Sequence, residues 1–240
     1  GLGEWSRVVG YRAVQLARHR NVEVILGTHL TAADVLAYGA EIVVVATGST
    51  WAGDGLNGLT HAPIPGVDAS LPHVLTPEQV MLDGKEPPGE HVLVYDTDGY
   101  FVAVSLAERL ALEGRRVTLA TPAAEPAAFM HATGEAPAMY RRLYELGVEQ
   151  RTSVTLLGLG DGRAVLEHHY DGRGRTELPV DALVAVTQRV SQDGLYRDLL
   201  ARREAWAEEA IEGVYRAGDC VVPRLVADAV FDGHRLAREI

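Results

Sequence analysis

The sequence predicts an α/β fold in which parallel sheets carry an attached antiparallel β-meander. Several short apolar runs are nearly continuous rather than alternating, which is typical of parallel strands buried on both faces. Between two of these runs lies a segment of helical periodicity. A strand, a helix and a second strand in such close succession form a parallel crossover unit.

Four apolar runs supply the predicted parallel strands, at residues 42–46, 91–95, 116–120 and 181–186. The predicted crossover helix, between the second and third runs, covers residues 105–113. Its apolar side chains recur at helical spacing, and Gly114 is a typical helix stop.

The predicted meander follows from turn residues that separate three short runs. Gly160-Asp161-Gly162 and the segment 171–174 are hairpin turns, and the strands around them are residues 153–157, 164–170 and 176–180. Residues 52–88 are rich in glycine and proline, so they are interpreted as a long connection between domains with a boundary near Gly89.

Composition excludes several classes of protein. The 240 residues carry 22 Lys+Arg against 33 Asp+Glu, a net charge of −11, which disfavours a nucleic-acid or anionic-membrane surface. The longest apolar run is far shorter than the roughly 20 residues of a membrane span. A single cysteine forms no internal disulfide and no iron–sulfur cluster, so we expect a cytoplasmic protein. The start at Gly1, without Met, indicates a piece of a longer chain.

Common catalytic and metal-binding motifs are absent. The sequence has no HExxH, paired CxxC or Gly-x-Ser-x-Gly motif. The adjacent His168 and His169 fall in a predicted surface hairpin without further ligands at suitable spacing, so we predict solvated side chains and no metal. Cys220 lacks a neighbouring base and is expected to be a buried packing thiol. No catalytic residue is assigned.

Two glycine-containing segments are candidates for ligand contact. Val43–Ser49 ends a predicted strand with Thr47-Gly48, and Gly213–Asp219 ends another with Gly218-Asp219. Glycine allows a ligand or a second chain segment to approach the backbone closely. An amphipathic helix is expected after Pro223, with its positive end near Asp219. Asp219 either accepts hydrogen bonds from a ribose or ribityl hydroxyl or caps the turn.

In combination, these segments resemble the flavoproteins with two dinucleotide-binding domains. A strand ending in Ala46-Thr47-Gly48, a nucleotide-fold unit, Gln188-Arg189 and Gly218-Asp219 before a final helix follow the pattern of that family. The resemblance implies Rossmann-like FAD/NAD(P)-binding domains. Residues 1–88 with 195–240 would be a partial ADP- or FAD-binding lobe lacking its first βαβ unit, and residues 89–194 an inserted NAD(P)-binding-like domain.

Further segments resemble the C-terminal region of the trimethylamine, dimethylamine and histamine dehydrogenase family. They are Gly1–Ser6, Ala46–Trp51, Pro63–Pro72, Leu75–Met81 and Pro223–Ala229, and the likeness covers nearly the whole chain. It implies that this region holds ADP or FAD, whereas FMN and a 4Fe-4S cluster belong to the missing N-terminal part. The implied cofactor-binding residues are Trp5, Ala46, Thr47, Gly48, Gly218 and Asp219.

The resemblance also implies the reaction of the parent enzyme. It would oxidise a small amine by N-demethylation or deamination and pass electrons to an electron-transferring flavoprotein. The family's ADP fingerprint would precede Gly1, so this chain is not expected to be catalytically complete, and a sheet lacking that strand favours a homo-oligomer.

One departure separates two branches of the superfamily. A Gly-x-Gly-x-x-Gly alignment places Asp96, Asp98 and Phe101 where glycines would contact a pyrophosphate, and Thr121 near the position of the acidic ribose ligand. This argues against the alternative of an NAD(P)H-dependent flavin oxidoreductase of the dienoyl-CoA reductase type. A third alternative is a non-catalytic domain for interaction or structural support.

Overall fold

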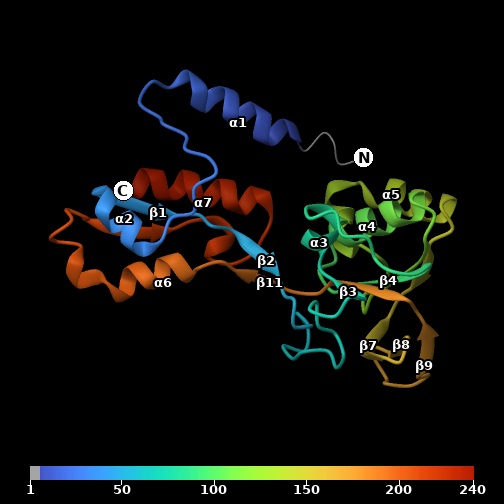
Figure 1. The fold of residues 1–240 in the computed structure, drawn as a ribbon. Coiled ribbons are helices and arrows are strands. Elements are labelled where there is room, and N and C mark those ends of the chain that lie inside the picture. The colour runs from blue at the N-terminus through green and yellow to red at the C-terminus, as the bar shows by residue number, and fades with distance from the viewer. Residues whose placement is uncertain (1–5) are drawn as a thin grey trace. The chain divides into compact units, whose positions relative to one another are not determined.

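The computed structural model describes residues 6–240, which divide into two compact units (Figure 1). The first unit contains the residues up to Ala46 together with Asp193–Ala217, and the second contains Thr47–Gln192 and Gly218–Ile240. Each unit is described by itself.

A five-stranded parallel sheet forms the centre of the second unit. Its order is β3-β10-β4-β5-β6, with β3 at Val74–Leu75, β10 at Ala182–Val186, β4 at His91–Asp96, β5 at Arg116–Ala120 and β6 at Glu149–Arg151. Three of the four predicted parallel strands are thereby confirmed in this sheet, and the α/β class is confirmed.

Helix α4, at Phe101–Leu112, connects β4 to β5 as the crossover helix. It begins four residues earlier than the predicted start at Ser105, because the residues from Phe101 onward already pack on the sheet: Ala103 and Val104 are buried. Helix α5, at Ala136–Glu145, and the 3₁₀ helix η2, at Ala128–Thr133, were not predicted.

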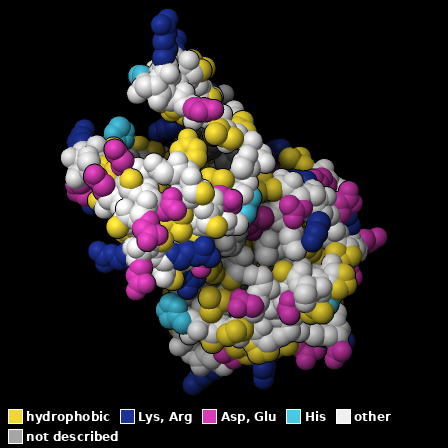
Figure 2. Space-filling model, turned by 60° about the vertical axis from the view of Figure 1, so that its left-hand side comes forward, with side chains coloured by type: hydrophobic (Ala, Val, Ile, Leu, Met, Phe, Trp, Pro, Cys, Tyr) yellow, Lys and Arg dark blue, Asp and Glu magenta, His cyan; other side chains and the backbone are white. Residues whose placement is uncertain are grey.

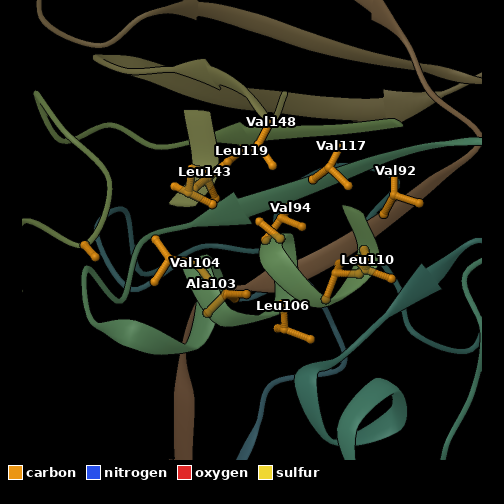
Figure 3. Close-up of a cluster of buried hydrophobic side chains, with 14 of the residues drawn as sticks. Val92, Val94, Ala103, Val104, Leu106, Leu110, Val117, Leu119, Leu143 and Val148 are labelled. Atoms are coloured by element: carbon orange, nitrogen blue, oxygen red, sulfur yellow. The ribbon is translucent and has the colours of Figure 1, made fainter. Parts of the chain in front are cut away.

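The central sheet is covered on both faces, and successive residues of β4 show this. Val92 and Val94 pack with the apolar side chains of α4 and α5 (Figure 3). Leu93 and Tyr95 pack with the opposite cluster, which contains the meander residue Leu166. Since full burial of each such side chain contributes about 1.5–3 kcal/mol, a continuous apolar run is favourable here.

The predicted meander is confirmed as a three-stranded antiparallel sheet. Its strands are β7 at Val154–Gly160, β8 at Arg163–His168 and β9 at Thr176–Pro179. His168 and His169 are exposed, as predicted.

Residues 52–88, interpreted from the sequence as a long connection between domains, form a packed segment of the second unit. Ile64 and Val67 are buried in the cluster that faces the meander, and the backbone at Gly66 approaches Leu159 so closely that a Cβ atom would lie 1.8 Å from its carbonyl oxygen. The segment also contains β3 and the short helix α3 at Pro77–Met81, which Thr76 caps. Its glycines and prolines shape a packed loop.

The first unit is built around a two-stranded sheet. Its parallel strands are β1 at Ile42–Val45 and β12 at Gly213–Arg216, and its helices are α1 at Ser6–Arg18, α2 at Ala32–Tyr38, α6 at Gly194–Ala201 and the 3₁₀ helix η3 at Arg203–Ala205. None of the four helices was predicted. Helix α1 buries none of its residues.

The prediction that the strand at residues 42–46 is buried on both faces was wrong. The side chains of Ile42 and Val44 are 37% and 43% exposed, and only Val45 in β1 is buried. Within residues 6–240, β12 is the only strand that pairs with β1, so the run lacks the neighbours that bury an interior strand.

The compact units do not coincide with the lobes bounded at residues 88 and 195 in the sequence-based division. Strand β3 pairs with β10, and β2, at Ser49–Trp51, pairs antiparallel with β11, at Arg189–Ser191. Helix α7, at Val226–Glu239, contacts the 3₁₀ turn η4 at Gly218–Cys220. Residues 47–88 and 218–240 belong to the second unit, where Asp219 accepts a hydrogen bond from Ser49 and the Arg224 carbonyl accepts one from Arg189.

On the face drawn in Figure 2, Lys and Arg side chains are interspersed with Asp and Glu side chains. Among the helices described, none has the length and apolar character needed to cross a membrane.

Candidate functional site

A cavity lies where the connections of the central sheet diverge. Strands β4 and β10 are neighbours, and the chain leaves β4 toward β5 on the side away from β10. In open parallel sheets, ligands bind beyond the carboxyl ends of strands at such a position. A cavity of about 320 Å³ opens here, lined by Gly58, Thr97, Asp98, Tyr100, Thr187, Gln188, Arg189, Pro223, Arg224, Leu225 and Asp228.

Asp219 joins the segments next to this cavity. Its Oδ2 accepts hydrogen bonds from Ser49 Oγ at 2.9 Å and from Arg189 Nη1 at 3.2 Å, and its Oδ1 accepts from the Arg224 amide at 3.0 Å. The backbone oxygen of Asp219 accepts from Ser191 Oγ at 2.9 Å. Asp219 therefore links the turn before α7 to Ser49 and Arg189. Three of the roughly four lone-pair positions of its carboxylate are occupied, so about one is left for a ligand.

Arg189 is the cationic centre of the lining. Its guanidinium donates to the Arg224 carbonyl at 3.0 Å, lies 3.6 Å from Asp98 and lies over the Trp51 ring with 5.8 Å between Cζ and the ring centroid. Burial raises the pKa of Asp98, and the positive charge of Arg189 opposes that rise. Two arginines and two aspartates line the cavity, so it favours polar, hydrogen-bonding ligands over bulk anions.

The structure brings together the two glycine-containing segments that were candidates for ligand contact. Ser49 follows Gly48, Asp219 follows Gly218, and the hydrogen bond between them spans 170 positions of sequence. Gly48 and Gly218 have φ angles of +78° and +69°, which L side chains rarely adopt. Thr47 Oγ1 donates a hydrogen bond to the backbone carbonyl of Gln192. The backbone amide of Gln192 in turn donates to the carbonyl oxygen of Gly48 at 2.9 Å.

The six predicted cofactor-binding residues do not all lie in the same part of the described structure. Trp5 lies outside the described residues, and Ala46 is the last residue of its stretch of the first unit. The other four belong to the second unit and lie in or beside the Asp219 hydrogen-bond network: Thr47, Gly48, Gly218 and Asp219. Their role in binding a cofactor remains a prediction.

The loop between β4 and α4 has the strand–loop–helix context of a dinucleotide fingerprint without its glycines. Asp96 is fully buried at the end of β4, and its Oδ1 accepts hydrogen bonds from the amides of Asp98 and Gly99 at 2.9 and 3.0 Å. Burial raises the pKa of Asp96 to about 7, against these hydrogen bonds. Phe101 is the first residue of α4.

The sequence analysis gave several residues of the site no individual role. Ser49, Ser191 and Arg224 complete the Asp219 network, but their partners are far away in the chain or separated by irregular spacing. Thr187 lines the cavity and is buried, and its Oγ1 has no hydrogen-bond partner among the described residues. No motif marks it. Cys220 is buried, as predicted for a packing thiol.

Comparison with known proteins gives a consistent set of relatives. Residues 75–178 match a family model described as the OYE-like second alpha/beta domain. Dimethylamine dehydrogenase of Hyphomicrobium sp. (strain x) is 42% identical over 264 residues, which cover 100% of this chain and 35% of that protein. A multifunctional alkene reductase/demethylase of Caballeronia cordobensis is 30% identical, over 98% of this chain and 36% of that protein.

Among solved structures, histamine dehydrogenase from Rhizobium sp. 4-9 superposes with a TM-score of 0.95 at 37% identity. The match covers 100% of this chain and 37% of that one. The chain thus spans about a third of the length of the relatives it matches.

Proposed function

From the premise that this chain is homologous along its whole length to amine dehydrogenases, which are oxidoreductases, we propose that it is the nucleotide-holding portion of a flavin-dependent amine dehydrogenase. Its task in that enzyme is to bind ADP or FAD, and the amine is oxidised elsewhere in the protein.

The Asp219 network is the observation that carries this proposal. It joins the Thr47-Gly48 and Gly218-Asp219 segments in the second unit. The network also includes the backbone amide of Arg224, two residues before α7 begins at Val226. Neither glycine carries a side chain: the Cβ position of Gly48 has no atom within 4 Å, so its backbone is open to a ligand, whereas that of Gly218 lies 3.4 Å from the Cβ atom of Ala229 in α7. Backbone amides of this kind, next to a helix N-terminus, suit a diphosphate, and the free lone pair of Asp219 suits a sugar hydroxyl.

The remaining parts of the proposed enzyme rest on the family resemblance of the sequence. We expect FMN and a 4Fe-4S cluster to lie outside these 240 residues, with a small amine as the substrate and an electron-transferring flavoprotein as the acceptor. A cytoplasmic location and a homo-oligomeric state belong to the same proposal.

Nucleotide content tests this role. Protein purified without added nucleotide is denatured, and the supernatant is analysed by mass spectrometry for ADP and FAD. The apoprotein is then titrated with each compound by calorimetry. We expect one of the two to be present or to bind saturably. Absence of both, with no saturable titration, would contradict the proposal.

A matched pair of glycine variants locates the site. Gly48→Ala and Gly84→Ala both place a Cβ at a positive φ, +78° and +67°, and neither Cβ meets an atom within 4 Å. Both are expected to cost about 1 kcal/mol of stability. Only Gly48→Ala should weaken nucleotide binding, by about tenfold or more. Equal binding by the two variants would place the nucleotide elsewhere.

A second candidate is an NAD(P)H-dependent reductase, which the alkene reductase relative favours. The loop after β4 argues against it, because Asp96 and Asp98 stand where the fingerprint requires glycines. Saturable binding of NADPH to the wild-type protein in the micromolar range would favour this candidate.

A further inference from the structure

The Asp96 side chain accepts hydrogen bonds from two backbone amides of the β4–α4 loop. Fingerprint loops present backbone amides at the start of a helix to a pyrophosphate. In this chain the corresponding amides belong to Asp98 and Gly99, and both donate to Asp96 Oδ1, at 2.9 and 3.0 Å. The two donors are therefore already taken by an oxygen atom of the same loop.

Burial fixes this arrangement. Asp96 has no solvent-exposed surface, and it pairs with Val186 in the register of β4 with β10, so its backbone is held by the sheet. An external anion would have to displace a carboxyl group that is tethered two and three residues from its donors. Because the carboxyl group is tethered, it competes with an external anion for the two amides at a high effective concentration.

Two aromatic rings stack on each other beside the loop. Phe129 stacks on Tyr100 with ring centroids 4.9 Å apart, and its amide donates to the Gly99 carbonyl at 3.1 Å. A Cβ atom at Gly99 would lie 2.9 Å from the Phe129 ring. Gly99 thus permits a close contact with the chain's own aromatic side chain.

We propose that Asp96 is the specificity-determining residue of this domain: its carboxyl group is an internal occupant of a latent phosphate site at the start of α4, and it excludes pyridine dinucleotides by saturating the Asp98 and Gly99 amides. Exclusion by hydrogen-bond occupancy differs from exclusion by charge. An uncharged acceptor at position 96 keeps the site closed, and loss of the neighbouring charge on Asp98 does not open it.

The test uses inorganic phosphate as the probe. Amide chemical shifts of Asp98 and Gly99 are followed by NMR during phosphate titrations of the wild type and four variants. Asp96→Gly and Asp96→Ala leave no side-chain acceptor for the two amides, and the second keeps the experiment informative should the first fail to fold. Asp96→Asn retains an acceptor without charge, and Asp98→Asn removes a charge without freeing the amides.

We expect saturable shifts of both amides, with millimolar affinity, in Asp96→Gly and Asp96→Ala only. The wild type, Asp96→Asn and Asp98→Asn should show shifts at least tenfold smaller. Saturable shifts in the wild type would overturn the proposal, as would a lack of response in folded Asp96→Gly and Asp96→Ala. A response of Asp96→Asn or Asp98→Asn equal to that of Asp96→Gly would assign the exclusion to charge and would also overturn it. None of these outcomes depends on ADP or FAD binding at the Asp219 network.

Discussion

Strands β1 and β4 have similar sequences and opposite environments. Both contain a run of four apolar residues, Ile42–Val45 and Val92–Tyr95, yet every residue of β4 is buried, whereas Ile42 and Val44 of β1 are substantially exposed. Strand β4 has β10 and β5 as neighbours, α4 on one face and the meander on the other. Strand β1 pairs only with β12 among the described residues. An apolar run therefore predicts a strand, and the number of its neighbours decides its burial.

Hydrogen exchange should give the largest contrast between the two strands. Amides of β4 are expected to open only with global unfolding, at about 5–15 kcal/mol, and those of β1 by local opening at a free energy at least about 5 kcal/mol lower. The measurement requires a sample shown to be monomeric, because pairing of β1 with a second copy would protect it. Equal, slow protection of Ile42–Val45 and Val92–Tyr95 in such a monomer would remove the contrast.

The pH dependence of stability should report the buried carboxyl group at the end of β4. Because burial raises the pKa of Asp96 to about 7 from 3.8, the folded state retains a proton that the unfolded state has lost. Its contribution to stability is complete below pH 3.8 and is lost as the pH rises through 7, a total of about 4 kcal/mol.

The free energy of unfolding, measured by urea denaturation at several pH values between 4 and 8, reports this loss of stability. Asp96→Asn, which keeps a neutral acceptor for the two amides, should lack it, whereas the exposed Asp161→Asn control should follow the wild type. Parallel pH profiles for the wild type and Asp96→Asn would show that Asp96 titrates normally.

A matched pair of valine truncations sharpens the comparison. Val94→Ala removes two buried methyl groups from β4 and leaves a cavity, so the free energy of unfolding should fall by about 2–3 kcal/mol. Val44→Ala, in an exposed position of β1, should cost less than about 1 kcal/mol. Denaturant unfolding followed by circular dichroism distinguishes them. Equal losses would mean that β1 is as well packed as β4.

The smallest expected effect tests the polar network beside the cavity. Ser49→Ala removes the 2.9 Å hydrogen bond to Asp219 and should lower the free energy of unfolding by about 1 kcal/mol. Thr60→Ala is the control, since its hydroxyl is exposed and lies 3.5 Å from its acceptor. A loss for Ser49→Ala no greater than for Thr60→Ala would show that the network does not hold the two segments together.

Local pattern was sufficient for much of the second unit. Continuous apolar runs and glycine-rich turns predicted β4, β5, β10 and the meander, because these elements are buried on both faces or punctuated by tight turns. The same pattern placed the Thr47-Gly48 and Gly218-Asp219 segments as candidates, and their resemblance to a flavoprotein family agrees with the amine dehydrogenase relatives. The exposed helix α1 gave too weak a signal, since it buries none of its residues.

Only the tertiary structure decided which groups meet. By itself, the sequence determined that a carboxylate stands at position 96 in place of a glycine, but it did not determine that this group accepts hydrogen bonds from its own loop. Likewise it supplied Ser49, Arg189 and Asp219, which are separated by 30 to 170 positions and joined only by the fold. Secondary structure follows local periodicity, whereas hydrogen-bond partners and burial depend on contacts between distant segments, and these contacts become fixed only when the sheet assembles.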